Sequence, residues 1–399
     1  MAAAPTLTLT PAYQSLGQVL FGDQGNDTIY LLRDLNGDGD AVDPGEYEVF
    51  FDGSNASGLV GPTGNVFDIY QASDGYVYAA DGDTDTVYRL RDLNGDGDAN
   101  DADEANVWFS DAENAEGFTL PTPQGVAQGP DGAIYIVNAG VPGGSNPRPF
   151  DAIYRTEDLN NDGDANDIGE ATVWLDLQTL NVSSSAFEST FVGDVAYVSD
   201  TVGGDTDVIY RVEDVDKNGV IDAGEATVFI DQDQSFGAPV DFAIDAQDGS
   251  ILTYSLSGDP RSIYRLTDLD GSGSIDAQEE AVEVWNETFM PDGFGMLAGF
   301  SIAAGKHGDV IITSNASDPE RDNVVRLTDL NGDGDYKDAG ETIIAMSRVL
   351  VSDVADRPRS VAYYEDGKTF PHGLAHLEGG PATAFAKDLT IADDDSTVL

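Results

Sequence analysis

The sequence contains no cysteine and little positive charge, and each absence excludes a class of protein. Without cysteine there are no disulfides, no thiolate metal sites and no cysteine nucleophile. Lysine and arginine number 18 against 74 aspartates and glutamates, which gives a formal net charge of −56. Nucleic acids and anionic membranes bind clustered cations, so we expect neither as a partner. No apolar run approaches the ~18 residues that span a bilayer, yet a hydrophobic fraction of 40% is enough for a folded core.

Familiar catalytic signatures are also missing. There is no G-x-S-x-G motif, no Walker loop and no dinucleotide fingerprint. The three histidines are His307, His372 and His376. The last two have the spacing of a helical metal pair, but Pro371 and Gly373 disfavour a helix. We therefore assign the histidines no metal role.

One acidic phrase recurs six times, at intervals of 54 to 66 residues. Its first copy is DLNGDGDAVDPGE, and the copies begin at Asp34, Asp92, Asp158, Asp214, Asp268 and Asp329. Such a period indicates a repeat architecture rather than unrelated domains.

Each repeat predicts four strands. The phrase is preceded by an aromatic–basic segment such as TVYRLRD (86–92) and followed by a β-rich segment such as ANVWFSD (105–111). An earlier pair of segments is joined by an Asp-Gly turn at 74–75, 131–132 or 248–249. Six four-stranded antiparallel units predict an all-β, six-bladed β-propeller with the acidic loop in each C–D hairpin. A β-solenoid is the alternative, although its rungs are usually shorter.

The first repeat lacks an obvious strand A, so we expect the C-terminal part of the chain to supply it. The segment 359–365 is one candidate, and 371–375, which resembles 123–127, is the other. Residues 1–14 are then an N-terminal segment, 15–370 the propeller, and 371–399 a C-terminal tail that can contribute to ring closure.

The acidic phrases predict one Ca²⁺ site per blade, about six in all. Ca²⁺ takes 6–8 oxygen ligands, and a 12-residue loop supplies them at positions 1, 3, 5, 7, 9 and 12. The fourth and fifth phrases fit this spacing directly, with position 7 contributing its carbonyl. Their predicted ligands are Asp214, Asp216, Asn218, Val220, Asp222, Glu225, Asp268, Asp270, Ser272, Ser274, Asp276 and Glu279.

The other four phrases are one residue longer, which leaves their last two ligands open. A one-residue bulge can return them to the ion, or a water can replace them. The aspartate at position 7 is a further candidate, through its side chain. The predicted ligands are Asp34, Asn36, Asp38, Asp40, Asp43, Glu46, Asp92, Asn94, Asp96, Asp98, Asp101, Glu104, Asp158, Asn160, Asp162, Asp164, Asp167, Glu170, Asp329, Asn331, Asp333, Asp335, Asp338 and Glu341.

A simple hydrophilic turn is the competing interpretation of these phrases. They hold 29 of the 74 acidic residues, however, and such clusters repel one another without a cation. Zinc is disfavoured because it prefers histidine and cysteine. An arginine stands three residues before five of the phrases, and we interpret these arginines as partners of nearby loop carboxylates: Arg89, Arg155, Arg211, Arg265 and Arg326.

The phrases resemble the DxDxDG calcium loops of EF-hands, dockerins, thrombospondin repeats and integrin propellers. Their strand–loop–strand setting is most similar to the "calcium blade" form of that loop. The segment 123–136 also resembles, loosely, the six-bladed NHL and gluconolactonase-like propellers. The resemblance implies a scaffold, and in gluconolactonase-like propellers Glu, Asn and Asp near the axis hold a catalytic calcium. By that analogy the catalytic candidates are Asp81, Asn138, Glu188, Asp200, Asp241 and Asn315.

Two functions follow as expectations. The first is a secreted or cell-surface calcium-binding propeller whose ions stabilise the blades, with a protein or polysaccharide ligand and a monomeric state. The second is a calcium-dependent hydrolase, such as a lactonase, phosphoesterase or phytase-like enzyme, with its site in the central funnel. Calcium storage or mineral contact through the acidic surface is a third. Export is also suggested by the opening MAAAP, which is similar to the start of a processed chain.

Overall fold

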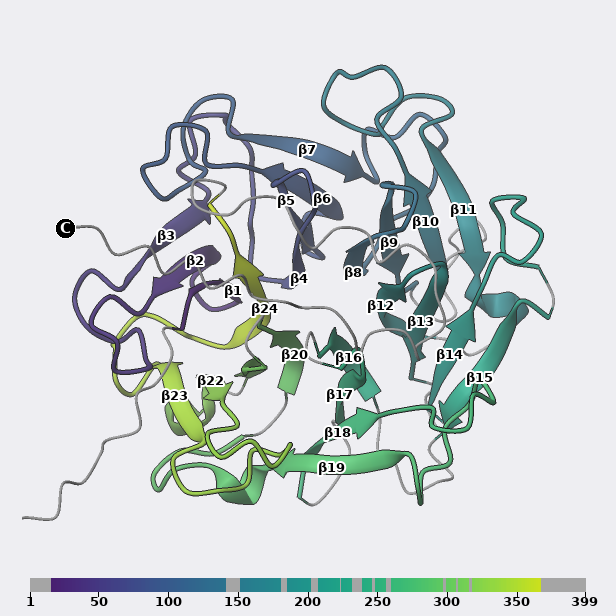
Figure 1. Cartoon of the computed structure of the whole chain (residues 1–399). Coiled ribbons are helices and arrows are strands. Elements are labelled where there is room, and N and C mark those ends of the chain that lie inside the picture. The colour runs from purple at the N-terminus through teal and green to yellow at the C-terminus, as the bar shows by residue number, and fades with distance from the viewer. Residues whose placement is uncertain are drawn as a thin grey trace, which may run out of the picture.

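The computed structural model describes residues 16–140, 151–180, 185–201, 207–222, 224–231, 239–245, 248–255, 260–296, 299–305, 308–315 and 318–366. In these residues 24 strands form six four-stranded antiparallel sheets. The sheets are arranged as blades around a common axis (Figure 1). The predicted six-bladed all-β propeller is therefore confirmed. No helix of the described ranges is long and apolar enough to cross a membrane.

The blades follow one another along the chain, each written here from its inner to its outer strand. Blade 1 is β24 (Pro358–Tyr364), β1 (Gln18–Asp23), β2 (Thr28–Arg33) and β3 (Tyr47–Asp52). Blade 2 is β4 (Val66–Gln71), β5 (Val77–Asp81), β6 (Thr86–Leu90) and β7 (Ala105–Ser110). Blade 3 is β8 (Pro123–Gln128), β9 (Ile134–Asn138), β10 (Ala152–Thr156) and β11 (Ala171–Asp176).

The remaining blades repeat the pattern. Blade 4 is β12 (Ala186–Val192), β13 (Val195–Asp200), β14 (Val208–Val212) and β15 (Ala226–Asp231). Blade 5 is β16 (Pro239–Ile244), β17 (Ile251–Ser255), β18 (Ser262–Leu266) and β19 (Ala281–Asn286). Blade 6 is β20 (Gly299–Ala304), β21 (Val310–Ser314), β22 (Asn323–Leu327) and β23 (Thr342–Ser347). Short 3₁₀ turns lie at η1 (Leu177–Thr179), η3 (Glu287–Phe289) and η4 (Pro319–Arg321).

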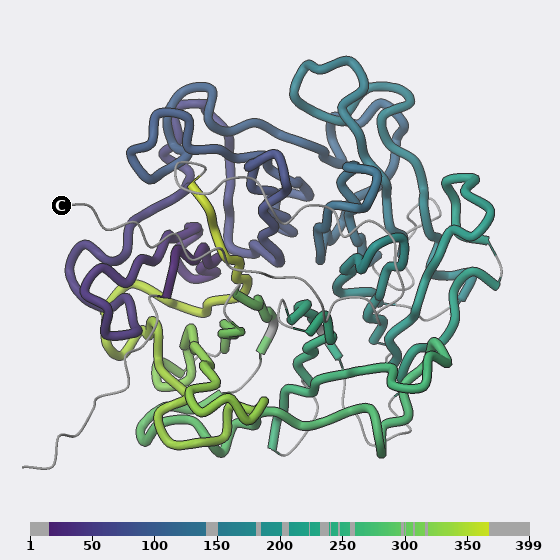
Figure 2. The backbone as a smooth tube through the Cα atoms, viewed as in Figure 1, coloured from purple at the N-terminus to yellow at the C-terminus, as the bar shows by residue number. Residues whose placement is uncertain are grey.

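Blade 1 combines strands from opposite parts of the chain. The strand expected at 359–365 is β24, which pairs antiparallel with β1. It also contacts the inner strands of both neighbouring blades, β20 and β4. In Figure 2 the yellow part of the tube returns beside the purple part. The other candidate strand at 371–375, the segments 1–14 and 371–399, and the three histidines lie outside the described residues.

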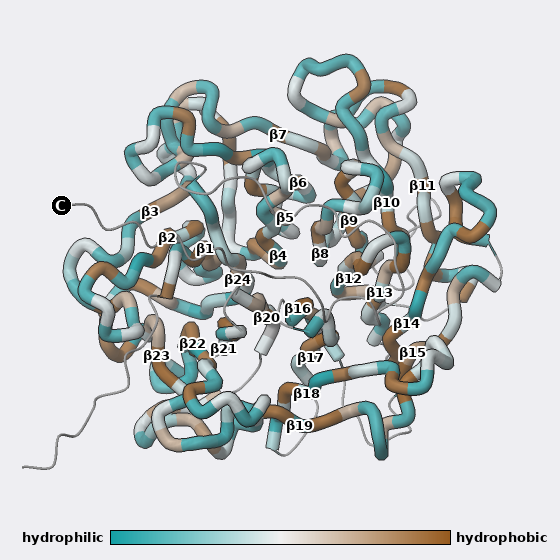
Figure 3. Tube along the Cα trace, in the orientation of Figure 1, coloured by the Kyte–Doolittle hydropathy of each residue, from teal (hydrophilic) through white to brown (hydrophobic). Residues whose placement is uncertain are grey.

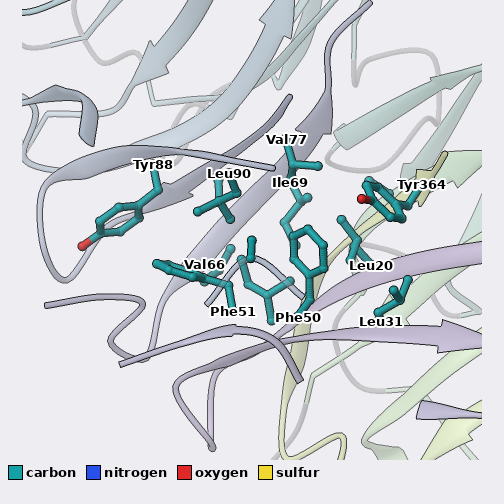
Figure 4. Close-up of a cluster of buried hydrophobic side chains, with 14 of the residues drawn as sticks. Leu20, Leu31, Phe50, Phe51, Val66, Ile69, Val77, Tyr88, Leu90 and Tyr364 are labelled. Carbon is teal, nitrogen blue, oxygen red and sulfur yellow. The ribbon is translucent and has the colours of Figure 1, made fainter. Parts of the chain in front are cut away.

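The hydrophobic core is divided among the boundaries between neighbouring blades, which we call seams. Six buried clusters occupy the six seams, and each draws side chains from two adjacent blades. Figure 4 shows the seam between blades 1 and 2, where Phe50 and Phe51 of β3 lie near Val66 and Ile69 of β4. In Figure 3 hydrophobic colour lies on the strands, whereas hydrophilic colour predominates in the peripheral loops. Blades are thus held together mainly by apolar burial.

A bulge recurs in the outer strand of every blade. Between strands C and D the register shifts by one residue, which leaves one strand-D residue without a Cα partner. A bulge residue makes no regular ladder bonds, so its carbonyl is free for another partner. The bulge residues are Phe50, Trp108, Trp174, Phe229, Val284 and Ala345.

Candidate metal sites in the C–D loops and the axial carboxylates

The six acidic phrases form the loops between strands C and D, with strands on both sides. In every loop the first aspartate accepts a hydrogen bond from the amide of the glycine at position 6, at 2.8–3.0 Å. In every loop a glutamate at the end accepts from the amide of position 2, at 2.7–3.0 Å. In each loop, the carboxylates of the first aspartate and of the last glutamate therefore both point toward the backbone of the loop.

The middle ligands gather in the same place. In the first loop the amide of Asn36 donates to Asp38 at 2.9 Å and to Asp43 at 2.8 Å. The corresponding asparagine of loops 2, 3 and 6 makes the same pair of contacts. Asp43 in turn donates its backbone amide to Glu46 at 3.2 Å. In the longer loops the side chains at positions 3, 5 and 10 are thus joined by hydrogen bonds, and the backbone of position 10 is joined to the glutamate at position 13.

Two loops have carboxylate oxygens that lie within 4.8 Å of one another and could hold a metal ion. Two oxygens that bind one Ca²⁺ at about 2.4 Å cannot be further apart than about 4.8 Å. These two groups are Asp214, Asp216 and Glu225 in loop 4, and Asp268, Asp270 and Glu280 in loop 5.

Loop 5 corrects one predicted ligand. Glu280, rather than Glu279, accepts the amides of Leu269 at 2.7 Å and Asp276 at 2.8 Å, as the terminal glutamate does elsewhere. Glu280 is 6% exposed, whereas Glu279 is exposed to solvent. The reason is local, because the turn after Asp276 contains one more residue than in the other loops. The 12-residue template would place this glutamate one position earlier.

The extra residue of the longer loops lies between positions 8 and 10. Superposing the hydrogen-bond pattern of loop 2 on loop 4 equates Ala99 with Ile221 and Asp101 with Asp222, so Asn100 is the insertion. With this insertion the amide of Asp101 makes the same bond to Glu104 that the amide of Asp222 makes to Glu225. The inserted residues are Val42, Asn100, Asn166 and Lys337.

The aspartate at position 7 makes a hydrogen bond that the sequence did not predict. Its carboxylate accepts the backbone amide of the inserted residue, as from Val42 to Asp40 at 3.1 Å. Loops 2, 3 and 6 repeat this bond. Loops 4 and 5 lack the insertion and have Val220 and Ser274 at position 7. Burial, and then repulsion from the neighbouring loop carboxylates, raises the pKa of Asp40. These aspartates cap the inserted residue.

A second acidic cluster lies where the inner strands converge. Asp68 of β4, Glu188 of β12 and Asp241 of β16 occupy equivalent bulge positions, and we call them the axial carboxylates. All three are nearly inaccessible, at 6–8% exposure. Glu188 and Asp241 were catalytic candidates, but Asp68 was missed. Aligning the inner strands of the repeats could have found it.

The axial carboxylates satisfy backbone amides that the inner strands leave unpaired. Asp68 accepts from Ile69 and from Val126 of the next blade, both at 2.8 Å. Asp241 accepts likewise from Phe242 at 2.6 Å and Ile302 of the next blade at 2.8 Å. Glu188 accepts from Ser189 at 2.7 Å, and Ser301 accepts from Val361 at 3.2 Å. One inner-strand amide from each of the six blades is thereby paired.

Protonation accommodates the crowding of these acids. Burial, and then repulsion from Asp68 and Asp241, raises the pKa of Glu188 well above its ordinary value. Burial also raises the pKa of Asp68, to about 6, although the hydrogen bonds from the amides of Val126 and Ile69 oppose the rise. Burial also raises the pKa of Asp241. The blade 3 position is Gly125, where a Cβ would lie 2.4 Å from Glu188 Oε2. Because Gly125 has no side chain, there is room beside it for Glu188, which is longer than the aspartates at the equivalent positions.

The four other catalytic candidates lie at or just beyond the ends of strands B and do not join this cluster. Asp81 accepts the amide of Thr63 at 2.8 Å, and Asp200 accepts that of Ser185 at 2.7 Å. Asn138 likewise accepts from the backbone of 122 at 3.2 Å. Asn315 donates to Gln24 at 2.9 Å and to the backbone of 357 at 3.2 Å. They anchor the connections between blades.

The arginines before the loops contact other partners than predicted. Arg155 pairs with Asp131 at 2.6 Å, and Arg265 pairs with Asp245 at 2.9 Å. Both aspartates belong to A–B turns rather than to the C–D loops. Arg89 donates to the carbonyl of Gly163 in the next blade's loop at 3.0 Å. These arginines lie near the ends of strands C. Strands A and C run in the same direction, so the A–B turn of a blade lies beside the end of its strand C.

Comparison with known proteins gives information on the fold alone. No family model matches the sequence, and no curated protein matches it. Among solved structures, a chain of a nidogen/laminin complex matches with a TM-score of 0.55 and 13% identity, over 88% of this chain and 98% of that chain. A streptogramin B lyase matches at 0.47 and 17%, over 90% of each chain. A gluconolactonase from Xanthomonas campestris matches at 0.46 and 15%, over 76% of this chain and 83% of that chain. At 13% identity, the likeness to the nidogen/laminin chain concerns the fold alone.

Proposed function

We propose that this protein is a calcium-binding propeller that works outside the cell or at its surface, where calcium stabilises the blades that present a binding surface. The observation that carries the proposal is the same inward-turned carboxylate loop in all six blades. Oxygen-only ligand sets suit Ca²⁺ rather than Zn²⁺. Extracellular-type loops have dissociation constants of about 0.1–1 mM, so they fill outside cells and not in the cytosol.

Metal counting and thermal unfolding test this function. We expect about six Ca²⁺ per chain by equilibrium dialysis with elemental analysis. At free calcium ten times the dissociation constant each site adds ~1.4 kcal/mol, and six sites add on the order of 8 kcal/mol. The melting temperature in millimolar calcium should therefore lie far above that in chelator. Equal melting temperatures and no bound calcium would contradict the proposal.

A calcium-dependent hydrolase is the second candidate, and the buried axial carboxylates are the observation that favours it. Their oxygens already accept the backbone amides of the inner strands, which gives them a structural role and favours the scaffold. The hydrolase requires a further ion on the axis. An anomalous-scattering map of a calcium-soaked crystal would separate the two, because ions confined to the C–D loops would exclude the hydrolase.

A further inference from the structure

We propose that each C–D loop closes the seam to the preceding blade, so that calcium binding joins blades together rather than stiffening one hairpin. This inference rests on the proposed calcium binding. It starts from the residue at position 8 of each loop, which we call the latch residue. The latch residues are Ala41, Ala99, Ala165, Ile221, Ile275 and Tyr336.

Every latch residue bonds to the preceding blade by its backbone. The amide of Ile275 in blade 5 donates to the carbonyl of Phe229 in β15 of blade 4 at 2.7 Å. The other five latch residues donate to the preceding blade at 2.7–2.9 Å. In all six cases the acceptor is the bulge residue of strand D, the one residue whose carbonyl the bulge releases. The bulge and the loop are thus two halves of one contact.

Every latch residue also belongs to a seam cluster by its side chain. Ile275 lies in the cluster between blades 4 and 5, and Tyr336 in the cluster between blades 5 and 6. The four others lie in the remaining seams, and all six are at most 7% exposed. A polar calcium loop with one buried apolar residue in its middle is therefore attached to the core of its neighbour.

The longer loops add contacts across the same seam. Asn100 of loop 2 accepts from Asp52 at 3.1 Å through its side chain and from Ala56 at 2.6 Å through its carbonyl. Asn166 of loop 3 repeats both bonds on blade 2. The inserted residue, which the calcium template does not require, makes contacts to the preceding blade. In loop 1 the amide of Ala41 donates to the carbonyl of Ala345 in blade 6. These contacts between neighbouring blades therefore continue around the whole ring.

Hydrogen exchange in one blade after removal of a ligand in the next tests the inference. Glu280→Gln should remove one Ca²⁺ per chain. It should also speed amide exchange in β15 of blade 4 about fivefold, the factor expected for one lost hydrogen bond in an opening equilibrium. Exchange is measured by mass spectrometry in excess calcium. Glu225→Gln serves as the crossed control, because it should act on β11 of blade 3.

A second pair of variants separates the latch from the ion. Ile275→Ala keeps every carboxylate, yet it should speed exchange in β15 and weaken calcium binding by loop 5, because coupling is reciprocal. Leu269→Ala removes an apolar side chain of the same loop that is 70% exposed, and it should change neither. An unchanged ion count in Glu280→Gln would overturn the calcium assignment. Loss of one ion with unchanged exchange in β15 would leave calcium binding intact and overturn the latch.

Discussion

At the scale of single residues, the axial carboxylates show how a propeller can bury acids that accept hydrogen bonds from backbone amides. The inner strands are sheet edges, and their unpaired amides would otherwise cost ~1–3 kcal/mol each. Asp68 and Asp241 each satisfy two of these amides, one of them in the next blade. Burial, and then repulsion from Asp68 and Asp241, raises the pKa of Glu188 and so favours its neutral form. The cluster thus exchanges solvation by water for hydrogen bonds from backbone amides.

Stability should depend on pH through this cluster. The folded-state pKa of Glu188 and Asp241 lies above the unfolded value near 4. Their contribution is therefore complete below about pH 4 and is lost as pH rises through the folded-state pKa. With calcium saturating, the melting temperature of the wild type should fall between pH 5.5 and 8.5. Glu188→Gln, which is neutral at every pH, should flatten that slope. An identical slope in the variant would refute the proton assignment, and the exposed Glu279→Gln is the control.

Gly125, which lies opposite Glu188, should not tolerate a larger side chain. In Gly125→Ala the new methyl would lie 2.4 Å from Glu188 Oε2 and displace a buried acid. We expect a loss of about 1–3 kcal/mol in the free energy of unfolding, as for other overpacked cores. Gly53→Ala is the matched control, since its Cβ would meet only the carbonyl of Val60 at 3.7 Å. Urea titration measures both, and equal stabilities would contradict the crowding argument.

At the scale of elements, the C–D loops determine what the sequence can and cannot predict. The strand segments 86–92 and 105–111 coincide with β6 and β7, because period and side-chain type are local properties. The register of the loops is harder to predict. One extra residue falls before Asp101 in loop 2 but before Glu280 in loop 5, and a fixed 12-residue template does not say which glutamate closes the loop. Asp68 was missed for a similar reason, because the bulge that aligns it with Asp241 is a property of strand pairing.

The two adjacent glutamates of loop 5 give a direct test of this register. Glu280→Gln should lower the number of bound Ca²⁺ by one, because it removes the carboxylate that lies with Asp268 and Asp270. Glu279→Gln changes the same charge one position earlier on an exposed side chain and should leave the count unchanged. Elemental analysis after dialysis measures both. The reverse result would restore the 12-residue template.

At the scale of the whole molecule, the ring depends on one late strand. β24 lends Val361 to the seam between blades 6 and 1, and Ala362 and Tyr364 to the seam between blades 1 and 2. Because one strand contributes to two of the six seams, its loss should affect more than one blade.

Truncation tests this dependence. A chain that ends after Arg357 lacks β24 and should lose cooperative unfolding. A chain that ends after Asp366 keeps all 24 described strands and should melt as the full chain does. Calorimetry in millimolar calcium distinguishes them. A cooperative transition in the shorter chain would show that blade 1 is dispensable.

The pairing of β24 with β1 also fixes an order of events during synthesis. Gln18 and Asp366, which share a hydrogen bond, are 348 positions apart. A ribosome therefore finishes five more blades while one edge of β1, which is already paired with β2 on its other side, still lacks β24. The ring can therefore close only after almost the whole propeller has been synthesised, so the last strand of the described residues completes the first blade.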